Sequence, residues 1–221
     1  MNYLSEREIR AIVEKMLTEH TAAKPCGGPA AEPIQAEISA RHVHLTAEAV
    51  EQLFGKGYTL HKKKNLSQPG EFASEERVKL VTAKGEIDRV SVLGPVRKAI
   101  QVELSVTDCR TLGVKAPVNL SGDLTGGADV LLIGPAGCVK ADGSVIVAKA
   151  HIHMTPADAR RYGVSDGETV SVRLHTRRPV TLDGVAVRVK ENFALAMHMD
   201  FDEANASLAD GTTMCTIAGK E

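Results

Sequence analysis

The sequence has 221 residues, of which 43% are hydrophobic and 25% are charged, so one large or two small domains with real cores can form. A formal net charge of -1, only 3% aromatic residues and no tryptophan argue against binding to nucleic acid or to a membrane surface. No apolar run approaches the roughly 20 residues of a membrane span, and the N-terminus lacks the apolar segment of a signal peptide, so we expect a cytoplasmic protein.

Residues 4–17 carry the signals of an amphipathic helix. Ser5 and Glu8 form a capping box, and the apolar residues that follow recur on one face. Residues 21–36 are rich in alanine, proline and glycine, which predicts a flexible linker. A short helix tethered in this way favours a docking peptide for another protein over packing against its own domain. We therefore assign residues 1–20 to a targeting helix and residues 21–36 to a linker.

From residue 37 onward the pattern changes to short strands separated by turns. Strands this short and evenly spaced favour barrels over a doubly wound sheet. Residues 47–54 and 156–162 are predicted to be short helices that close barrel ends. We expect a mainly β protein of two related β-barrel domains with short capping helices. The first barrel is assigned to residues 37–125 and 196–221, and the second to residues 126–195.

Two His-x-His sequences occur in this strand-rich part. His42 and His44 form the first, and His151 and His153 form the second. Alternate side chains of a strand project to the same face about 7 Å apart, which is a usable separation for two ligands of one metal ion. Each sequence runs into a helix start, with Thr46 or Thr155 as the N-cap.

A degenerate third copy contains a single histidine, His198, followed by Asp200 as a helix N-cap. Five histidines are too many for one catalytic zinc site, which usually has three protein ligands and an open position. Five histidines and one carboxylate would make two sites. Glu103 is a candidate for the carboxylate, but the sequence pattern does not select it over Glu86 or Glu191. The duplication makes metal binding a better interpretation than a merely polar strand face.

Other candidate residues are less clear from the pattern alone. Arg97 follows a turn, and its guanidinium suits a phosphate, although an arginine in a turn is often simply solvated. The lysine run 62–64 is either an exposed loop or a basic patch for a polyphosphate. The four cysteines (Cys26, Cys109, Cys138 and Cys215) have no Cys-x-x-Cys spacing, so we expect reduced structural thiols. No glycine-rich phosphate loop is present.

Taken together, these residues resemble a known family. The sequences around His42, Arg97, Glu103, His151 and His198 resemble the PduL-type phosphate propanoyltransferases, which are phosphotransacylases of bacterial microcompartments that metabolise propanediol. The resemblance extends from about residue 37 to the C-terminus. Residues 1–36 resemble an encapsulation peptide and its linker, which implies docking to shell or core proteins and a location in the microcompartment lumen.

The resemblance also implies the contents of the site. One zinc ion would be held by His42, His44 and Glu103, and a second zinc ion would be held by His151, His153 and His198. Arg97 would bind phosphate, and Ser39, Lys64 and Asn205 would contribute to a coenzyme A pocket between the barrels. A homo-oligomer is compatible with the sequence, which does not determine the oligomeric state.

The implied reaction converts a short-chain acyl-CoA and phosphate to an acyl phosphate and CoA. Propanoyl-CoA is the expected substrate, and acetyl-CoA is not separated from it by the sequence. No serine or cysteine stands in an activated setting, which favours direct attack by phosphate over an acyl-enzyme. Two alternatives stay open at this point, namely a zinc-dependent thioester hydrolase and a non-catalytic metal-binding scaffold of a microcompartment.

Overall fold

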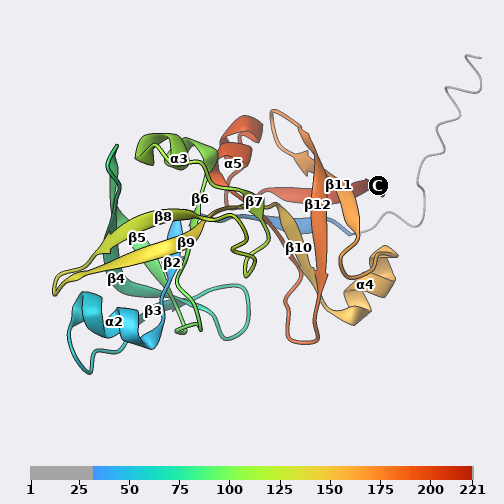
Figure 1. Ribbon diagram of the computed structural model, residues 1–221. Helices are drawn as coiled ribbons and strands as arrows, with labels where there is room; N and C mark the ends of the chain where they lie inside the picture. Colours follow the sequence, from blue (N-terminus) through green and yellow to red (C-terminus); the bar gives the residue numbers. More distant parts are fainter. Residues whose placement is uncertain (1–31, 221) are drawn as a thin grey trace, which may run out of the picture. The chain divides into compact units, whose positions relative to one another are not determined.

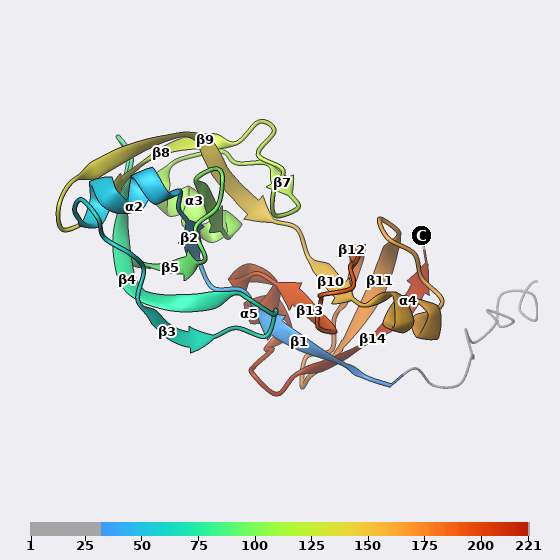
Figure 2. The same cartoon turned by 90° about the horizontal axis from the view of Figure 1, so that it is seen from below.

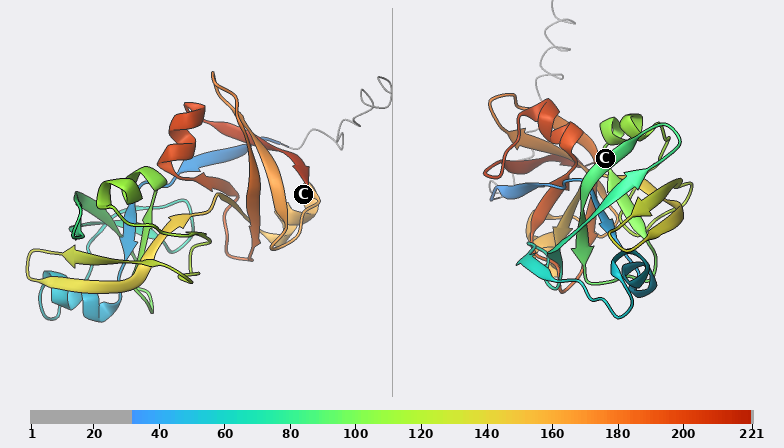
Figure 3. Two further views of the ribbon diagram at one scale, coloured as in Figure 1. Left: turned by 45° about the horizontal axis from the view of Figure 1, so that its top comes forward. Right: turned by 90° about the vertical axis from the view of Figure 1, so that its left-hand side faces the viewer.

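The computed structural model describes residues 32–220, so the predicted targeting helix and residues 21–31 of the predicted linker lie outside the described residues. Within residues 32–220 the protein is mainly β, with four short helices (Figure 1). The strands form two barrels that lie side by side when viewed from several directions (Figure 2; Figure 3). The predicted architecture of two β-barrels with short capping helices is confirmed.

The first barrel, named here the His42 barrel, is a ring of six strands. Its two parallel contacts are β2–β5 and β6–β9, and the other contacts are antiparallel. Strand β3 (Lys62–Asn65) extends the sheet beside β4, and β7 (Val118–Asn119) extends it beside β9. In ring order the six strands are β2 (His42–His44), β5 (Glu86–Gly94), β4 (Phe72–Val81), β8 (Ala128–Ile133), β9 (Cys138–Ala148) and β6 (Gln101–Leu104).

The second barrel, named the His151 barrel, is also a closed ring of six strands. It again has two parallel contacts, β10–β12 and β1–β13. A separate hydrophobic core fills each barrel, with Leu80, Val92 and Leu132 in the first and Ile152, Leu174 and Met197 in the second. In ring order the strands are β10 (His151–Met154), β12 (Thr181–Val189), β11 (Thr169–His175), β14 (Met214–Lys220), β1 (Ile34–Ile38) and β13 (Ala196–Met199).

The two rings have the same order of parallel and antiparallel contacts, so the two barrels are structural repeats. Each barrel contains one strand that comes from the other half of the chain. Strand β1 precedes β2 in the chain but pairs in the His151 barrel, and β9 precedes β10 but pairs in the His42 barrel. The pairing therefore divides the chain differently from the predicted boundaries. Residues 128–148 belong with the first barrel, residues 196–220 belong with the second, and β1 begins inside the predicted linker. Short-range patterns identify strands but not their distant partners.

Four helices follow the four strands that carry the predicted metal ligands. Each helix is capped two residues after a predicted ligand, by the side chain of Thr46, Ser105, Thr155 or Asp200, which accepts a hydrogen bond from a backbone N–H. No helix within residues 32–220 is long and apolar enough to cross a membrane. The caps fix the strand ends and thereby help to position the ligands. The helices are α2 (Ala47–Phe54), α3 (Val106–Leu112), α4 (Pro156–Tyr162) and α5 (Phe201–Ser207).

Candidate active site

The first candidate metal site, the His42 triad, consists of His42, His44 and Glu103. Strands β2 and β6 are antiparallel neighbours, and His42 lies directly opposite Glu103 in their register. The Nε2 atom of His42 is 3.6 Å from Oε2 of Glu103, and Nε2 of His44 is 4.0 Å from Oε1. All three side chains are buried, and one ligand atom from each lies within 4.8 Å of the other two. The predicted residues are therefore brought together.

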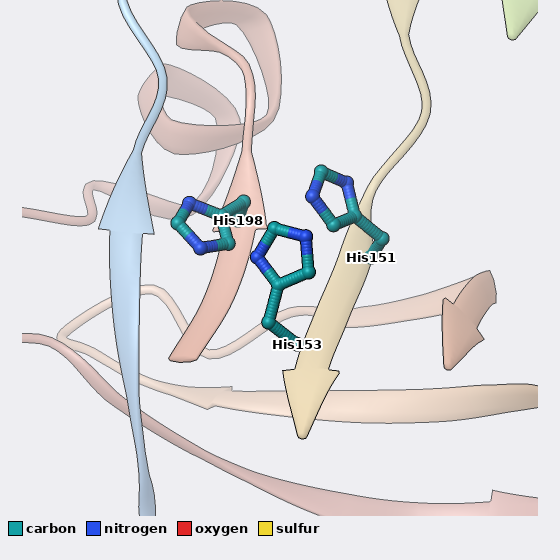
Figure 4. A group of neighbouring side chains, drawn as sticks. All are labelled: His151, His153 and His198. Atoms are coloured by element: carbon teal, nitrogen blue, oxygen red, sulfur yellow. The ribbon is translucent and has the colours of Figure 1, made fainter. Parts of the chain in front are cut away.

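The second candidate site, the His151 triad, consists of His151, His153 and His198 (Figure 4). Strands β10 and β13 are antiparallel, and His151 lies directly opposite His198. The ring centroids are 4.6 Å apart for His151 and His153, 5.2 Å for His151 and His198, and 4.9 Å for His153 and His198. Figure 4 shows the three rings grouped together, with His151 and His153 on one strand and His198 on its neighbour. The sites are equivalent in the two barrels, with Glu103 and His198 at matching positions.

Hydrogen bonding orients the histidines in the same way in both triads. The Nδ1 atoms of His42 and His151 each lie 2.8 Å from a backbone carbonyl oxygen, that of Ala40 or Lys149. A carbonyl only accepts, so Nδ1 carries the proton and the lone pair of Nε2 is free. The buried Nδ1 atoms of His44 and His153 have no hydrogen-bond partner among the described residues. Buried imidazole nitrogens are rarely left without a partner. Together with the free Nε2 lone pairs of His42 and His151, these nitrogens fit a bound metal ion, which binds to imidazole lone pairs.

The protonation states favoured by the surroundings also suit metal binding. Burial lowers the pKa of His44 and of His153 to about 2 and that of His198 to about 3, and it lowers the pKa of His151 as well. Burial acts to raise the pKa of Glu103, but the charge of His42 outweighs it and the pKa falls. Neutral imidazoles and an ionised carboxylate are the forms that bind metal ions. His42 is the exception among the five histidines: burial acts to lower its pKa, but the neighbouring Glu103 carboxylate outweighs burial and the pKa rises.

Both triads face one cavity of about 570 Å³. Residues of both barrels line it, and the basic ones outnumber the acidic ones by five to three. Of the three predicted CoA-contacting residues, Ser39 and Lys64 line the cavity, whereas Asn205 is exposed on α5 and is not among the lining residues. The cavity is therefore a basic pocket suited to an anionic ligand. Its basic residues are Arg41, Lys64, Arg97, Arg188 and Lys190, and its acidic residues are Glu37, Glu71 and Glu103.

Arg97 reaches the cavity from the turn after β5. Its backbone N–H donates to the carbonyl oxygen of Leu45 at 2.8 Å, which ties the turn to the end of β2. One guanidinium nitrogen pairs with Oε1 of Glu71 at 2.9 Å, and the other donates to the hydroxyl of Ser121 at 3.3 Å. The same hydroxyl accepts from the amide of Gln101, which also donates to Glu103. A continuous chain of hydrogen bonds therefore connects Arg97 with the His42 triad.

Several residues at the site were not predicted from the sequence. Gln101 and Ser121 hold Glu103, Gln68 donates to the carbonyl oxygen of Ala194 near the His151 triad, and Phe193 packs its ring 4.2 Å from that of His153. Gln101 could have been found by strand alternation, since it lies two residues before Glu103. The others come from loops that only the tertiary structure brings to the cavity.

The fold and the site together define a class of protein. Its members have two joined barrels, and each barrel places one triad suited to a metal ion at the same basic cavity. Within that class, the chain belongs to the phosphate propanoyltransferase family, since the model of that family matches residues 35–210. Members of this family are acyltransferases.

Similar proteins are found in several bacteria. A phosphate propanoyltransferase of Leptotrichia buccalis is 49% identical over 203 residues, which cover 92% of this chain and 94% of the relative. One of Clostridioides difficile is 51% identical over 187 residues, covering 85% and 90% of the two chains. One of Thermotoga maritima is 51% identical over 172 residues, covering 77% and 82%. The family suggested by the sequence motifs is confirmed.

Proposed function

We propose that the protein transfers a short acyl group from coenzyme A to inorganic phosphate, giving an acyl phosphate and free CoA in a reversible reaction. Propanoyl-CoA is the proposed substrate, and acetyl-CoA is the nearest alternative. The observation that carries the proposal is the placement of two buried triads and Arg97 around one basic cavity. Family membership supports the same reaction.

The two triads are proposed to hold one zinc ion each. Imidazole nitrogen and carboxylate oxygen are common zinc ligands, and three protein ligands leave a position open, as in catalytic zinc sites. When bound, such an ion supplies a Lewis acid for a carbonyl or phosphate oxygen and a soft partner for a thiolate. Imidazole also accepts cobalt, nickel and iron, so metal analysis decides which ion is bound.

Arg97 is proposed to hold the attacking phosphate. A phosphate oxygen forms a bond to the thioester carbonyl carbon, the carbon–sulfur bond then breaks, and its electron pair leaves with the CoA sulfur. Arg97 would orient the phosphate and offset the negative charge that develops during the attack. Ser39 and Lys64 are proposed to contact CoA from the cavity wall. Asn205 has only the family resemblance in its favour.

A covalent intermediate on a cysteine has no support among the described residues. Cys109 and Cys215 are buried, and burial raises their pKa values to about 11 and about 12. Cys138 is exposed and does not line the cavity. Because the thiolate is the nucleophilic form, none of these three residues fits that role. Direct attack by phosphate is the proposed course.

The test is release of CoA thiol from propanoyl-CoA with and without inorganic phosphate, on protein of measured metal content. Phosphate-dependent release with close to two zinc ions per chain would support the proposal. Release that does not need phosphate would indicate a hydrolase, in which water attacks instead. Bound metal without any release would leave a metal-binding scaffold.

Residues 1–20 are proposed to dock the enzyme to shell or core proteins of a bacterial microcompartment, so that it works in the lumen. The support is the amphipathic pattern of these residues and the linker composition that follows. Deletion of residues 1–20 should abolish co-purification with the shell and leave thiol release intact. Loss of thiol release in the truncated protein would instead make these residues part of the catalytic fold.

A further inference from the structure

A second arginine, Arg188, lies beside the His151 triad. It is in β12, where it stands directly opposite His153 of β10 in the parallel register. Its side chain is half-buried and lines the cavity. Arg97 lines the same cavity and is linked to the His42 triad through Ser121 and Gln101.

Arg188 differs from Arg97 in what its guanidinium contacts. Arg97 shares an ion pair with Glu71 at 2.9 Å. Within residues 32–220, the side chain of Arg188 makes no ion pair or hydrogen bond, and its guanidinium carbon lies 5.9 Å from the ring centroid of Phe193. Glu71, Glu103 and Asp166 act on its charge without forming an ion pair with it. Leaving the five N–H donors of a half-buried guanidinium without a protein acceptor is costly. A guanidinium that lines a cavity without a protein acceptor is suited to bind an anionic group of a substrate.

We infer that Arg188 binds the phosphate substrate at the His151 triad, and that Arg97 and Arg188 hold its oxygens from two sides. The inference rests on the proposed function and adds a second phosphate-binding residue to it. A guanidinium binds phosphate oxygens in a bidentate manner, which fixes orientation as well as position. Coenzyme A also carries phosphate groups, so the experiment has to distinguish binding of inorganic phosphate from binding of the phosphate groups of CoA.

The variants are Arg188→Gln, Arg188→Lys and, as a matched control, Arg173→Gln. Arg173 lies in the neighbouring strand β11, is exposed and does not line the cavity. In Arg188→Gln we expect the KM for phosphate to rise about 10- to 100-fold, since a hydrogen bond to a charged group is lost. Arg188→Lys should recover part of the loss, because it keeps the charge without the fork, and the control should match wild type. Metal content is measured in every sample.

Propanoyl-pantetheine, a thioester without the nucleotide phosphates, separates the two sources. If Arg188 binds the phosphate substrate, the rise in phosphate KM persists with this thioester. If the effect disappears, Arg188 contacts the phosphates of CoA and the inference is wrong. In one further variant, Arg188→Ala, added guanidinium ion should partly restore phosphate affinity, a rescue that a merely structural role of the side chain would not give.

A binding measurement keeps the test independent of turnover. Calorimetric titration of wild type and Arg188→Gln with inorganic phosphate should show weaker binding in the variant. Equal binding, or an unchanged phosphate KM in an active variant, would overturn the role of Arg188 while leaving the proposed function standing. Absence of phosphate-dependent release in wild type would refute the proposed function itself, and the titration would still decide whether Arg188 binds phosphate. Arg188→Lys serves if Arg188→Gln does not fold.

Discussion

The two triads occupy the same backbone frame and differ in one ligand. In each barrel the first histidine of a His-x-His strand lies directly opposite the third ligand on an antiparallel neighbour, Glu103 in one case and His198 in the other. Since a carboxylate brings a negative charge and an imidazole does not, a divalent ion would be more fully neutralised at the His42 triad. The duplicated fold sets where the ligands lie, and one side chain sets the charge of the site.

The surroundings of the two triads also differ, in exposure and in the groups that hold the third ligand. Glu103 is buried and held by Gln101, whereas the side chain of His198 is 14% exposed and its Nδ1 atom lies 3.7 Å from Oε2 of Glu37. A carboxylate near the outer nitrogen of a ligating histidine orients the ring and raises its basicity. We therefore expect a closed site with an anionic ligand in the His42 barrel and a more accessible site in the His151 barrel, where phosphate is proposed to bind.

The largest expected effect comes from removing either third ligand. Glu103→Ala and His198→Ala should each lower the metal content by about one ion per chain and reduce turnover by at least about 100-fold, since loss of even an outer partner of a metal ligand costs 10- to 100-fold. Metal analysis and thiol release measure both effects. Glu86→Ala is the control, because Glu86 is an exposed residue paired with Lys79. Retention of two ions in either ligand variant would contradict the assignment.

Replacing Arg97 should have the next largest effect. Arg97→Ala removes a positive charge from the cavity, so we expect a steep rise in the phosphate KM and a fall in turnover of about 100-fold. Steady-state kinetics with varied phosphate, with Arg173→Ala as control, measure it. Phosphate kinetics equal to those of wild type would remove Arg97 from the mechanism.

Exchanging the ligand type sharpens the comparison of the two sites. Glu103→His should give the His42 triad the composition of the His151 triad, so we expect the metal to be retained while turnover falls about 10-fold, because the charge and the contact with Gln101 change. Metal analysis on the same sample as the kinetic assay distinguishes this outcome from simple loss of the ion. Wild-type turnover in Glu103→His would show that the carboxylate is not needed for its charge.

The N-terminal caps of α3 and α5, which follow Glu103 and His198, also differ, and this difference should give a smaller effect on stability that depends on pH. In α3 the capping-box residue Asp108 has Arg41 3.2 Å away, but in α5 the corresponding Glu203 is half-buried near Asp200 and Asp202, and its partial burial together with these charges raises its pKa to about 7. The folded state therefore keeps a proton that the unfolded chain has lost, and the free energy of unfolding falls as pH rises from about 4.5 to 7.

Denaturant unfolding at pH 5 and pH 8 tests this cap. Between these pH values, the free energy of unfolding of wild type should fall by about 2–3 kcal/mol more than that of Glu203→Gln, which keeps the hydrogen bond to the cap but does not ionise. Glu86→Gln provides the exposed control. An identical pH dependence for wild type and Glu203→Gln would mean that Glu203 ionises normally in the folded protein.

The smallest expected effect is that of alkylating the thiols of residues 32–220. Iodoacetamide at pH 8 should modify the exposed Cys138 and leave Cys109 and Cys215 unmodified, since burial raises the pKa of both. Thiol release should be unchanged in Cys138→Ser and in the enzyme alkylated at Cys138. Peptide mapping identifies the modified residue, and inactivation that follows modification at Cys138 would reopen a covalent mechanism.

Much of the site could be predicted because its signals are local. Alternation along a strand places His42 with His44 and His151 with His153, and capping residues mark where α2 and α4 begin. These patterns depend only on neighbours in the chain. The family resemblance then supplied Glu103, which the pattern alone did not separate from Glu86 or Glu191.

What the sequence by itself determined is therefore the strand and helix pattern, the histidine pairs and the family. Only the tertiary structure decided that Glu103 lies opposite His42 while Glu86 is exposed beside Lys79, that β1 and β9 are exchanged between barrels, and that Arg188 lines the cavity without an ion-pair partner within residues 32–220. The physical reason is that strand pairing and cavity lining join residues far apart in the chain, and their register is set by the packing of two cores rather than by local periodicity.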